Sequence, residues 1–188
     1  MTRGALSDHL PEVLTDVRRL RVRFAATAAH SWDATTAAAE LSVQLGHLSL
    51  CLLRKNGTDI STLEDPQRPL ADPGDELADV VLAALSINVL AGSEPIATHP
   101  TAAASASDDV EPFLRLIVAA GALSEAALVQ GQYRHQPTGT PPSLPEAAAA
   151  VINACDALAD QLGMDLISEF RSMVADADSF LDNRRDAS

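Results

Sequence analysis

The sequence predicts an all-α fold, and three observations lead to this prediction. Ala and Leu are abundant whereas aromatic residues make up only 3% of the 188 residues, a composition that favours helix over strand. Apolar residues recur at the three- and four-residue spacing of a helix face through nearly all of the periodic sequence. The alternation typical of strands is missing from the sequence. We therefore expect a helical bundle with an aliphatic core.

Helical periodicity divides the chain into six expected helices. The expected ranges are about 11–29, 34–54, 75–91, 110–132, 146–162 and 165–182.

Start and stop residues support these boundaries. Pro11 suits the first turn of a helix, and Asp33 or Ser31 is a suitable cap for the second one. Asn56-Gly57 is expected to end the second helix, and Gly163 to break the chain before the last one. The third expected helix is apolar on every side, which indicates a helix packed all round rather than one lying on a surface.

Two segments lack helical periodicity. Residues 93–109 are rich in Ala, Ser, Thr and Pro, which predicts a linker or long loop. Residues 136–145 contain four prolines and a glycine, which predicts a second loop.

The two halves of the sequence resemble each other. Leu45–Ser49 is similar to Ala120–Ser124, and each lies midway along a long apolar helix. Glu76–Asp79 and Glu146–Ala149 each precede an apolar helix that ends in a glycine. We interpret this as an internal duplication with a repeat of roughly 70–75 residues. The expected parts are a first helical unit at 10–92, a linker at 93–109 and a degenerate second unit at 110–185.

The charge of the chain limits its partners. A formal net charge of −13 repels nucleic-acid backbones and anionic membranes, so we expect neither as an extended partner. A small phosphorylated ligand remains compatible, because a metal ion reverses the potential locally. Cys51 and Cys155 lie in apolar helical stretches and are expected to be buried, reduced thiols. With neither a leader peptide nor a membrane-spanning apolar run recognised, a soluble cytoplasmic protein is expected.

Two carboxylates stand at the start of the third expected helix. Glu76 and Asp79 are three residues apart and therefore share a helix face. Carboxylates beside a buried helix need cationic partners, and a divalent metal ion is the simplest one. The alternative is that acids in a first turn merely complement the helix dipole.

Several motifs together resemble one known family. Trp32-Asp33, residues 41–48, residues 76–80 and Asn88 are similar to motifs of the MazG-like all-α nucleoside triphosphate pyrophosphohydrolases, which include related dimeric dUTPases and dCTPases. The resemblance covers about residues 13–92, with a weaker echo over about 111–185. It implies a MazG-like helical bundle, a homodimer, and Mg²⁺-dependent release of a nucleoside monophosphate and pyrophosphate. A duplicated chain could satisfy the dimer packing alone.

The resemblance implies a metal site with an acidic pair on each of two helices. The second pair corresponds to Glu76 and Asp79, but the first corresponds to Gln44 and His47. A glutamine oxygen is a neutral ligand and imidazole is a poor partner for Mg²⁺, although His47 could bind a softer ion or act as an acid or base. Glu40 lies one turn before Gln44 on the same face and could supply the missing carboxylate.

The expected metal ligands are thus Glu40, Gln44, His47, Glu76 and Asp79, with Mg²⁺, Mn²⁺ or another divalent ion. The expected catalytic residues are Glu40, His47, Glu76 and Asp79. The corresponding positions of the second half are Ala119, Ala122 and Ala149 or Ala150, which cannot make such a site.

The resemblance also implies residues that contact the nucleotide. Trp32 would stack on the base, with packing between helices as the alternative, and His30 is a secondary candidate for the base pocket. Arg54 and Lys55 are cations near the expected phosphate position, although cations at a helix C-terminus are ordinary. Asn88 would face the metal site, and in a buried helix it needs a hydrogen-bond partner.

Two functions follow from these expectations. The first is a divalent-metal-dependent hydrolase of nucleoside triphosphates or of a related phosphorylated metabolite, of which a variant would use altered metal chemistry at His47. The second is a catalytically degenerate MazG-like fold that serves as a binding or regulatory subunit. Loss of the first acidic pair favours the second function, whereas retention of Glu76, Asp79, Trp32 and Asn88 favours the first.

Overall fold

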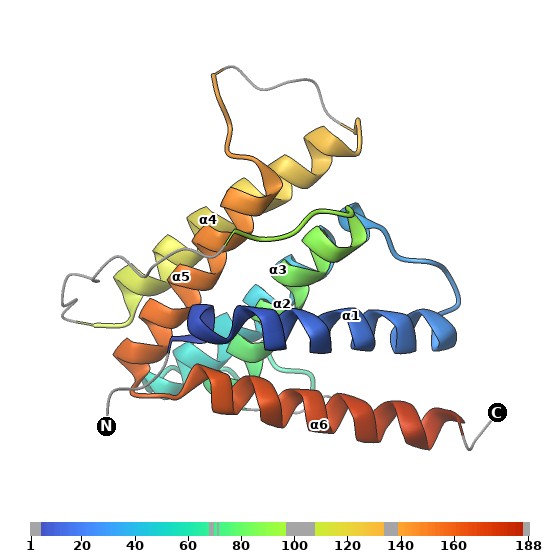
Figure 1. The fold of residues 1–188 in the computed structure, drawn as a ribbon. Coiled ribbons are helices and arrows are strands. Elements are labelled where there is room, and N and C mark those ends of the chain that lie inside the picture. The colour runs from blue at the N-terminus through green and yellow to red at the C-terminus, as the bar shows by residue number, and fades with distance from the viewer. Residues whose placement is uncertain (1–4, 68–69, 71, 97–107, 134–138, 186–188) are drawn as a thin grey trace.

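The structure is a computed structural model that describes residues 5–67, 70, 72–96, 108–133 and 139–185. Every regular element in these ranges is a helix, which confirms the all-α prediction (Figure 1). A short 3₁₀ helix, η1, precedes six α-helices. The bounds are η1 Leu6–His9, α1 Leu10–Thr27, α2 Ala34–Lys55, α3 Pro73–Leu90, α4 Val110–Gln130, α5 Leu144–Leu162 and α6 Leu166–Arg185.

Side-chain caps set the starts of α2 and α3. The Asp33 carboxylate accepts the Thr36 backbone N–H at 2.7 Å, so Asp33 is the cap of α2. Asp72 caps α3 by accepting the backbone N–H groups of Gly74 and Asp75. As a result α3 begins at Pro73, about two residues earlier than the sequence predicts.

The start of α5 is also earlier than predicted. Ser143 and Glu146 form a capping box, in which each side chain accepts a hydrogen bond from the other residue's backbone N–H. Pro145 therefore lies in the first turn of α5 and not in the preceding loop, because a proline there forfeits only an N–H that has no helical partner. The helix ends at Gly163, whose φ of 76° is the left-handed conformation that glycine adopts without strain.

Helix α3 lies at the centre of the molecule and contacts each of the other five α-helices. Most of its residues are buried and the rest are half-buried, as its apolar sequence predicts. Helices α2 and α3 form one closely packed pair, and α4 and α5 form another (Figure 1). Buried residues from both expected units, 10–92 and 110–185, join in one hydrophobic core. Residues 97–107 of the expected linker lie outside the described residues.

Ion pairs fasten α1 to α6, which lie side by side (Figure 1). Arg19 and Arg23 of α1 both pair with Asp178 of α6, and Arg23 also pairs with Asp182. Hydrogen bonding from Arg19 holds the pKa of Asp178 below its ordinary value. These contacts set the position of the last turns of α6 relative to α1.

The η1 segment is anchored by a buried acid. The Asp156 carboxylate of α5 accepts the backbone N–H of Leu6 at 2.9 Å and that of Ser7 at 3.5 Å. Leu6 is fully buried, and burial raises the pKa of Asp156.

Helices α2 and α4 are long and apolar enough to cross a membrane by the criteria of length and composition alone. Core helices of water-soluble proteins meet the same criteria, and α2 is closely packed against α3, so these two helices do not assign the chain to a membrane. Cys51 and Cys155 are buried thiols outside any disulfide, as predicted.

Candidate functional site

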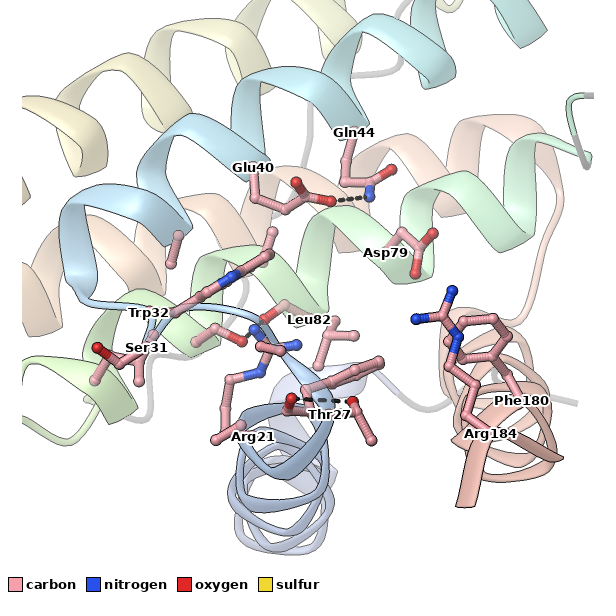
Figure 2. Close-up of a pocket in the computed structure, with 17 residues that line it drawn as sticks. Arg21, Thr27, Ser31, Trp32, Glu40, Gln44, Asp79, Leu82, Phe180 and Arg184 are labelled. Atoms are coloured by element: carbon pink, nitrogen blue, oxygen red, sulfur yellow. Dashed lines mark hydrogen bonds between the residues drawn. The ribbon is translucent and has the colours of Figure 1, made fainter. Parts of the chain in front are cut away.

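A cavity of about 640 Å³ lies between α1, the loop that follows it, α2, α3 and α6 (Figure 2). Apolar side chains and two arginines line the side formed by α1 and α6, whereas the α2 and α3 side carries two carboxylates. Four residues expected from the sequence line this cavity together: Trp32, Glu40, Gln44 and Asp79.

The polar residues of α2 form a continuous row, as their spacing predicts. The Gln44 amide nitrogen donates a hydrogen bond to Glu40 Oε1 at 2.7 Å. On its other side, Gln44 Oε1 lies 3.2 Å from Nδ1 of His47. Gln44 is buried, and its amide is thus satisfied at both ends by neighbours on its own helix.

The row continues from α2 onto α3. His47 Nδ1 lies 3.6 Å from Oε2 of Glu76, which is only 5% exposed. The imidazole is therefore placed to share a proton or a positive charge with a buried carboxylate. Burial and the nearby Glu76 carboxylate raise the pKa of the Cys51 thiol to about 11, so that Cys51 is no nucleophile at neutral pH.

The donor atoms of this row do not fit Mg²⁺ as they are arranged. Mg²⁺ requires several oxygen ligands in an octahedron, with carboxylates directed at one point. Here an amide N–H is directed at Glu40, and an imidazole nitrogen stands between Gln44 and Glu76. Within the described part of the chain, no group of three His, Cys, Asp or Glu side chains is placed to hold a metal ion.

Glu76 and Asp79 reach different surroundings although they are three residues apart. Glu76 joins the buried row beside His47, whereas Asp79 lines the cavity. Figure 2 shows Asp79 and Arg184 of α6 directed toward each other. The common helix face predicted for the two acids therefore does not bring them to one ligand position.

Arg21 of α1 lines the cavity, although it is not among the residues predicted there from the sequence. Its guanidinium carbon lies 4.8 Å from the centre of the Phe24 ring and 5.1 Å from that of Trp32. Burial lowers the pKa of Arg21, and the charge of Glu40 opposes this shift. The Nε atom is buried without a hydrogen-bond partner.

A second arginine has a similar setting. The Arg184 guanidinium lies over the Phe180 ring at 4.9 Å, and both residues line the cavity. The signal that could have identified these arginines is spacing, since each lies three or four residues from an aromatic residue on its own helix, Arg21 from Phe24 and Arg184 from Phe180.

The two cations expected near a phosphate lie at the far end of α2. Arg54 Nη1 is 3.6 Å from Glu64, and Lys55 Nζ is 3.0 Å from Asp109. Among the described residues, the cavity lining includes neither Arg54 nor Lys55.

Two other expected ligand contacts also lie apart from the cavity lining, namely His30 and Asn88. Asn88 is fully buried, and its side-chain oxygen accepts a hydrogen bond from the Ser93 hydroxyl at 3.2 Å. Its amide nitrogen has no hydrogen-bond partner. Asn88 thus has half of the partners that a buried amide requires.

Comparison with known proteins gives no match to a family model, to a curated protein or to a solved structure.

Proposed function

We propose that the chain is a MazG-like helical protein that binds a nucleotide or another small phosphorylated ligand in the cavity, as a binding or regulatory subunit without hydrolase activity. The observation that carries this proposal is the row Glu40–Gln44–His47–Glu76, in which the carboxylates of two helices are hydrogen-bonded or paired within the protein.

The row supports binding over hydrolysis for a chemical reason. In the resembling family, the positions of Gln44 and His47 hold carboxylates that share a divalent ion. In this chain an amide and an imidazole occupy those positions and interact with the remaining acids. The imidazole of His47 thus takes a position beside Glu76 that a metal ion would otherwise take.

The cavity supports a small organic ligand. Its volume of about 640 Å³ falls within the range of roughly 300–1,000 Å³ found for small-molecule sites. Three aromatic rings, those of Phe24, Trp32 and Phe180, line it together with the charged groups of Arg21 and Glu40. Apolar rings with a few polar groups are the usual composition of a site for a planar, charged molecule.

The burial of α2 and α4 supports the proposed internal repeat. Residues 41–52 and 116–127 alternate between buried and exposed positions in the same order, and differ only at Gln44, which is buried, and Ala119, which is half-buried. Matching helix faces are what a duplicated helix pair would retain.

The second candidate is the divalent-metal-dependent pyrophosphohydrolase. One observation favours it: Glu40 of α2 and Asp79 of α3 line the same cavity. A metal ion between them would require Gln44 to release Glu40.

Calorimetric titration with ribo- and deoxyribonucleoside triphosphates tests both candidates, alongside an assay for released pyrophosphate with Mg²⁺, with Mn²⁺ and with EDTA. We expect at least one nucleotide to bind and pyrophosphate release to stay at background. Metal-dependent release that Asp79→Asn abolishes in a folded protein would establish the hydrolase instead. Neither binding nor release for any nucleotide would overturn the proposal.

A further inference from the structure

We propose that Arg21 binds an oxyanion of the ligand directly, without a bridging metal ion, so that the acidic end of the ligand lies against α1 and away from the carboxylates of α2 and α3. This inference rests on the proposed function for the use of the cavity and adds which end of the ligand is bound where.

The surroundings of Arg21 prepare its guanidinium for an oxyanion. The group lies over the rings of Phe24 and Trp32, whose faces attract the cation but accept no strong hydrogen bond from it. The Nε–H is buried without an acceptor, a costly state for a charged donor. A phosphate or carboxylate group in the cavity would stabilise this poorly solvated charge through the part of Arg21 that lines the cavity, because guanidinium and oxyanion match in charge and in paired hydrogen bonds.

The charges around the cavity direct an oxyanion to this side. Glu40 and Asp79 project from α2 and α3, whereas Arg21 and Arg184 project from α1 and α6 (Figure 2). Like charges repel strongly where water is partly excluded, so the acidic group of a ligand avoids Glu40 and Asp79. Without a metal ion to reverse this repulsion, the arginine side is where an oxyanion is stabilised.

Arg184 contributes less than Arg21. Its guanidinium lies over one ring, that of Phe180, and is directed toward Asp79. The Arg21 guanidinium has the charge of Glu40 acting on it, but it lies over two rings and has a buried Nε–H without an acceptor. The pairing of Arg23 with Asp178 and Asp182 ties the last turns of α6 to α1, which keeps Arg184 at the cavity. We therefore expect Arg21 to be the main oxyanion contact and Arg184 a supporting one.

The stacking of Arg21 also changes the role expected for Trp32. One face of the indole carries the guanidinium, so a base that stacks on Trp32 has only the other face available. In this arrangement the main role of Trp32 is to hold Arg21 in place.

The test is calorimetric titration of the full chain in EDTA with two probes, inorganic pyrophosphate and citrate. The first represents a phosphoryl ligand and the second a carboxylate ligand, and the tighter probe identifies the oxyanion class. We expect Arg21→Gln to weaken binding of that probe by about tenfold or more, the usual cost of a lost charge-assisted pair of hydrogen bonds. Arg184→Gln should weaken it by about two- to fivefold.

Matched controls exist on the same two helices. Arg18 of α1 pairs with Glu94, and Arg171 of α6 pairs with Glu12, so that Arg18→Gln and Arg171→Gln remove the same charge from the same helices outside the cavity. Both controls should bind the probe as the parent protein does. If Arg21→Gln does not fold, Arg21→Lys keeps the charge but loses the planar fork, and it should still weaken binding several-fold.

Three results would overturn the inference: no binding of either probe in EDTA, binding that the Arg21 variants leave unchanged, or binding weakened equally by the two controls. Failure of the proposed function gives a different pattern. Nucleotide binding that requires Mg²⁺ would leave the proposed function standing and remove the direct arginine contact. The opposite pattern is that pyrophosphate or citrate binds through Arg21 while no nucleotide or other phosphorylated organic ligand binds. That result would keep the arginine contact and remove the proposed function.

Discussion

The helix pairs α2–α3 and α4–α5 are each closely packed but carry different polar residues. Over residues 41–52 and 116–127, buried and exposed positions follow the same order with one exception. The exception is Gln44, which corresponds to Ala119. His47, which lies beside Gln44 on α2, corresponds to Ala122.

The second pair therefore shows what packing alone requires. Two helices with this burial pattern pack against each other with alanines at the positions of Gln44 and His47. The first pair adds polar groups at those positions, and a buried polar group stabilises a fold only when it is fully hydrogen-bonded. Packing of such a helix pair therefore does not by itself require the row from Glu40 to Glu76.

The largest expected effect tests whether the two pairs are equivalent. Leu48 and Leu123 occupy matching positions and are both fully buried. Each substitution to alanine should lower the free energy of unfolding by about 2–5 kcal/mol, from lost burial and the cavity left behind. Urea denaturation followed by circular dichroism measures this. Because the two pairs share one core, both variants should shift a single transition. A loss confined to the Leu48 variant would show that the second pair is packed differently.

A smaller effect tests the polar row that distinguishes the first pair. His47→Ala removes the imidazole beside the buried Glu76 carboxylate and should cost about 1–3 kcal/mol. Adding Glu76→Gln removes the buried charge that His47→Ala leaves without its imidazole neighbour. The free energy of unfolding of the double variant should therefore be higher than the sum of the two single effects predicts. A double-mutant cycle from urea denaturation at pH 7 measures this coupling. Strictly additive effects would mean that His47 and Glu76 do not interact.

The smallest effect compares the first turns of α3 and α5 through their pH dependence. Burial, with Asp72 nearby, raises the pKa of Asp75 in α3, whereas hydrogen bonds from Ser143 lower the pKa of Glu146 in α5. The contribution of Asp75 to the free energy of unfolding is therefore complete below its ordinary pKa of 3.8, and it is lost as the pH rises through the pKa of the folded state. The Glu146 contribution is present above the ordinary value of 4.5 and is lost as the pH falls through the folded pKa.

Two variants check these opposite signs. Asp75→Asn should raise the melting temperature more at pH 7 than at pH 4. The gain in the free energy of unfolding should stay below about 1 kcal/mol, because the group is partly exposed. Glu146→Gln keeps a hydrogen-bond acceptor in the capping box and should lower the melting temperature at pH 7 more than at pH 4. If both variants changed the melting temperature in the same direction at pH 7 relative to pH 4, the opposite pKa shifts of Asp75 and Glu146 would be contradicted.

Much of the fold could be predicted because helical periodicity depends on local sequence. The early starts of α3 and α5 could not, since Asp72 and Ser143 stand in proline-containing segments that look like loop until their hydrogen bonds are seen. The η1 helix could not be predicted from the sequence for another reason. It is held by Asp156, a residue 150 positions further along the chain, and its own sequence is too short to show a period.

The candidate site was predictable where its residues share a helix. The row of Glu40, Gln44 and His47 follows from their spacing on α2. Arg21 and Arg184 could not be placed, because they reach the cavity from helices at opposite ends of the sequence. Only the packing of α1 and α6 against α3 brings these two arginines to one cavity.

The hydrogen bond from Leu6 to Asp156 has a consequence for how the protein is made. A chain is synthesised from its N-terminus at about 5–20 residues per second, so Asp156, 150 residues further along, follows Leu6 by roughly 8 to 30 s. During that interval Leu6 lacks the α5 surface on which it is buried in the folded protein. The η1 segment therefore cannot take its folded position until translation has passed α5, so its docking depends on a contact distant in sequence.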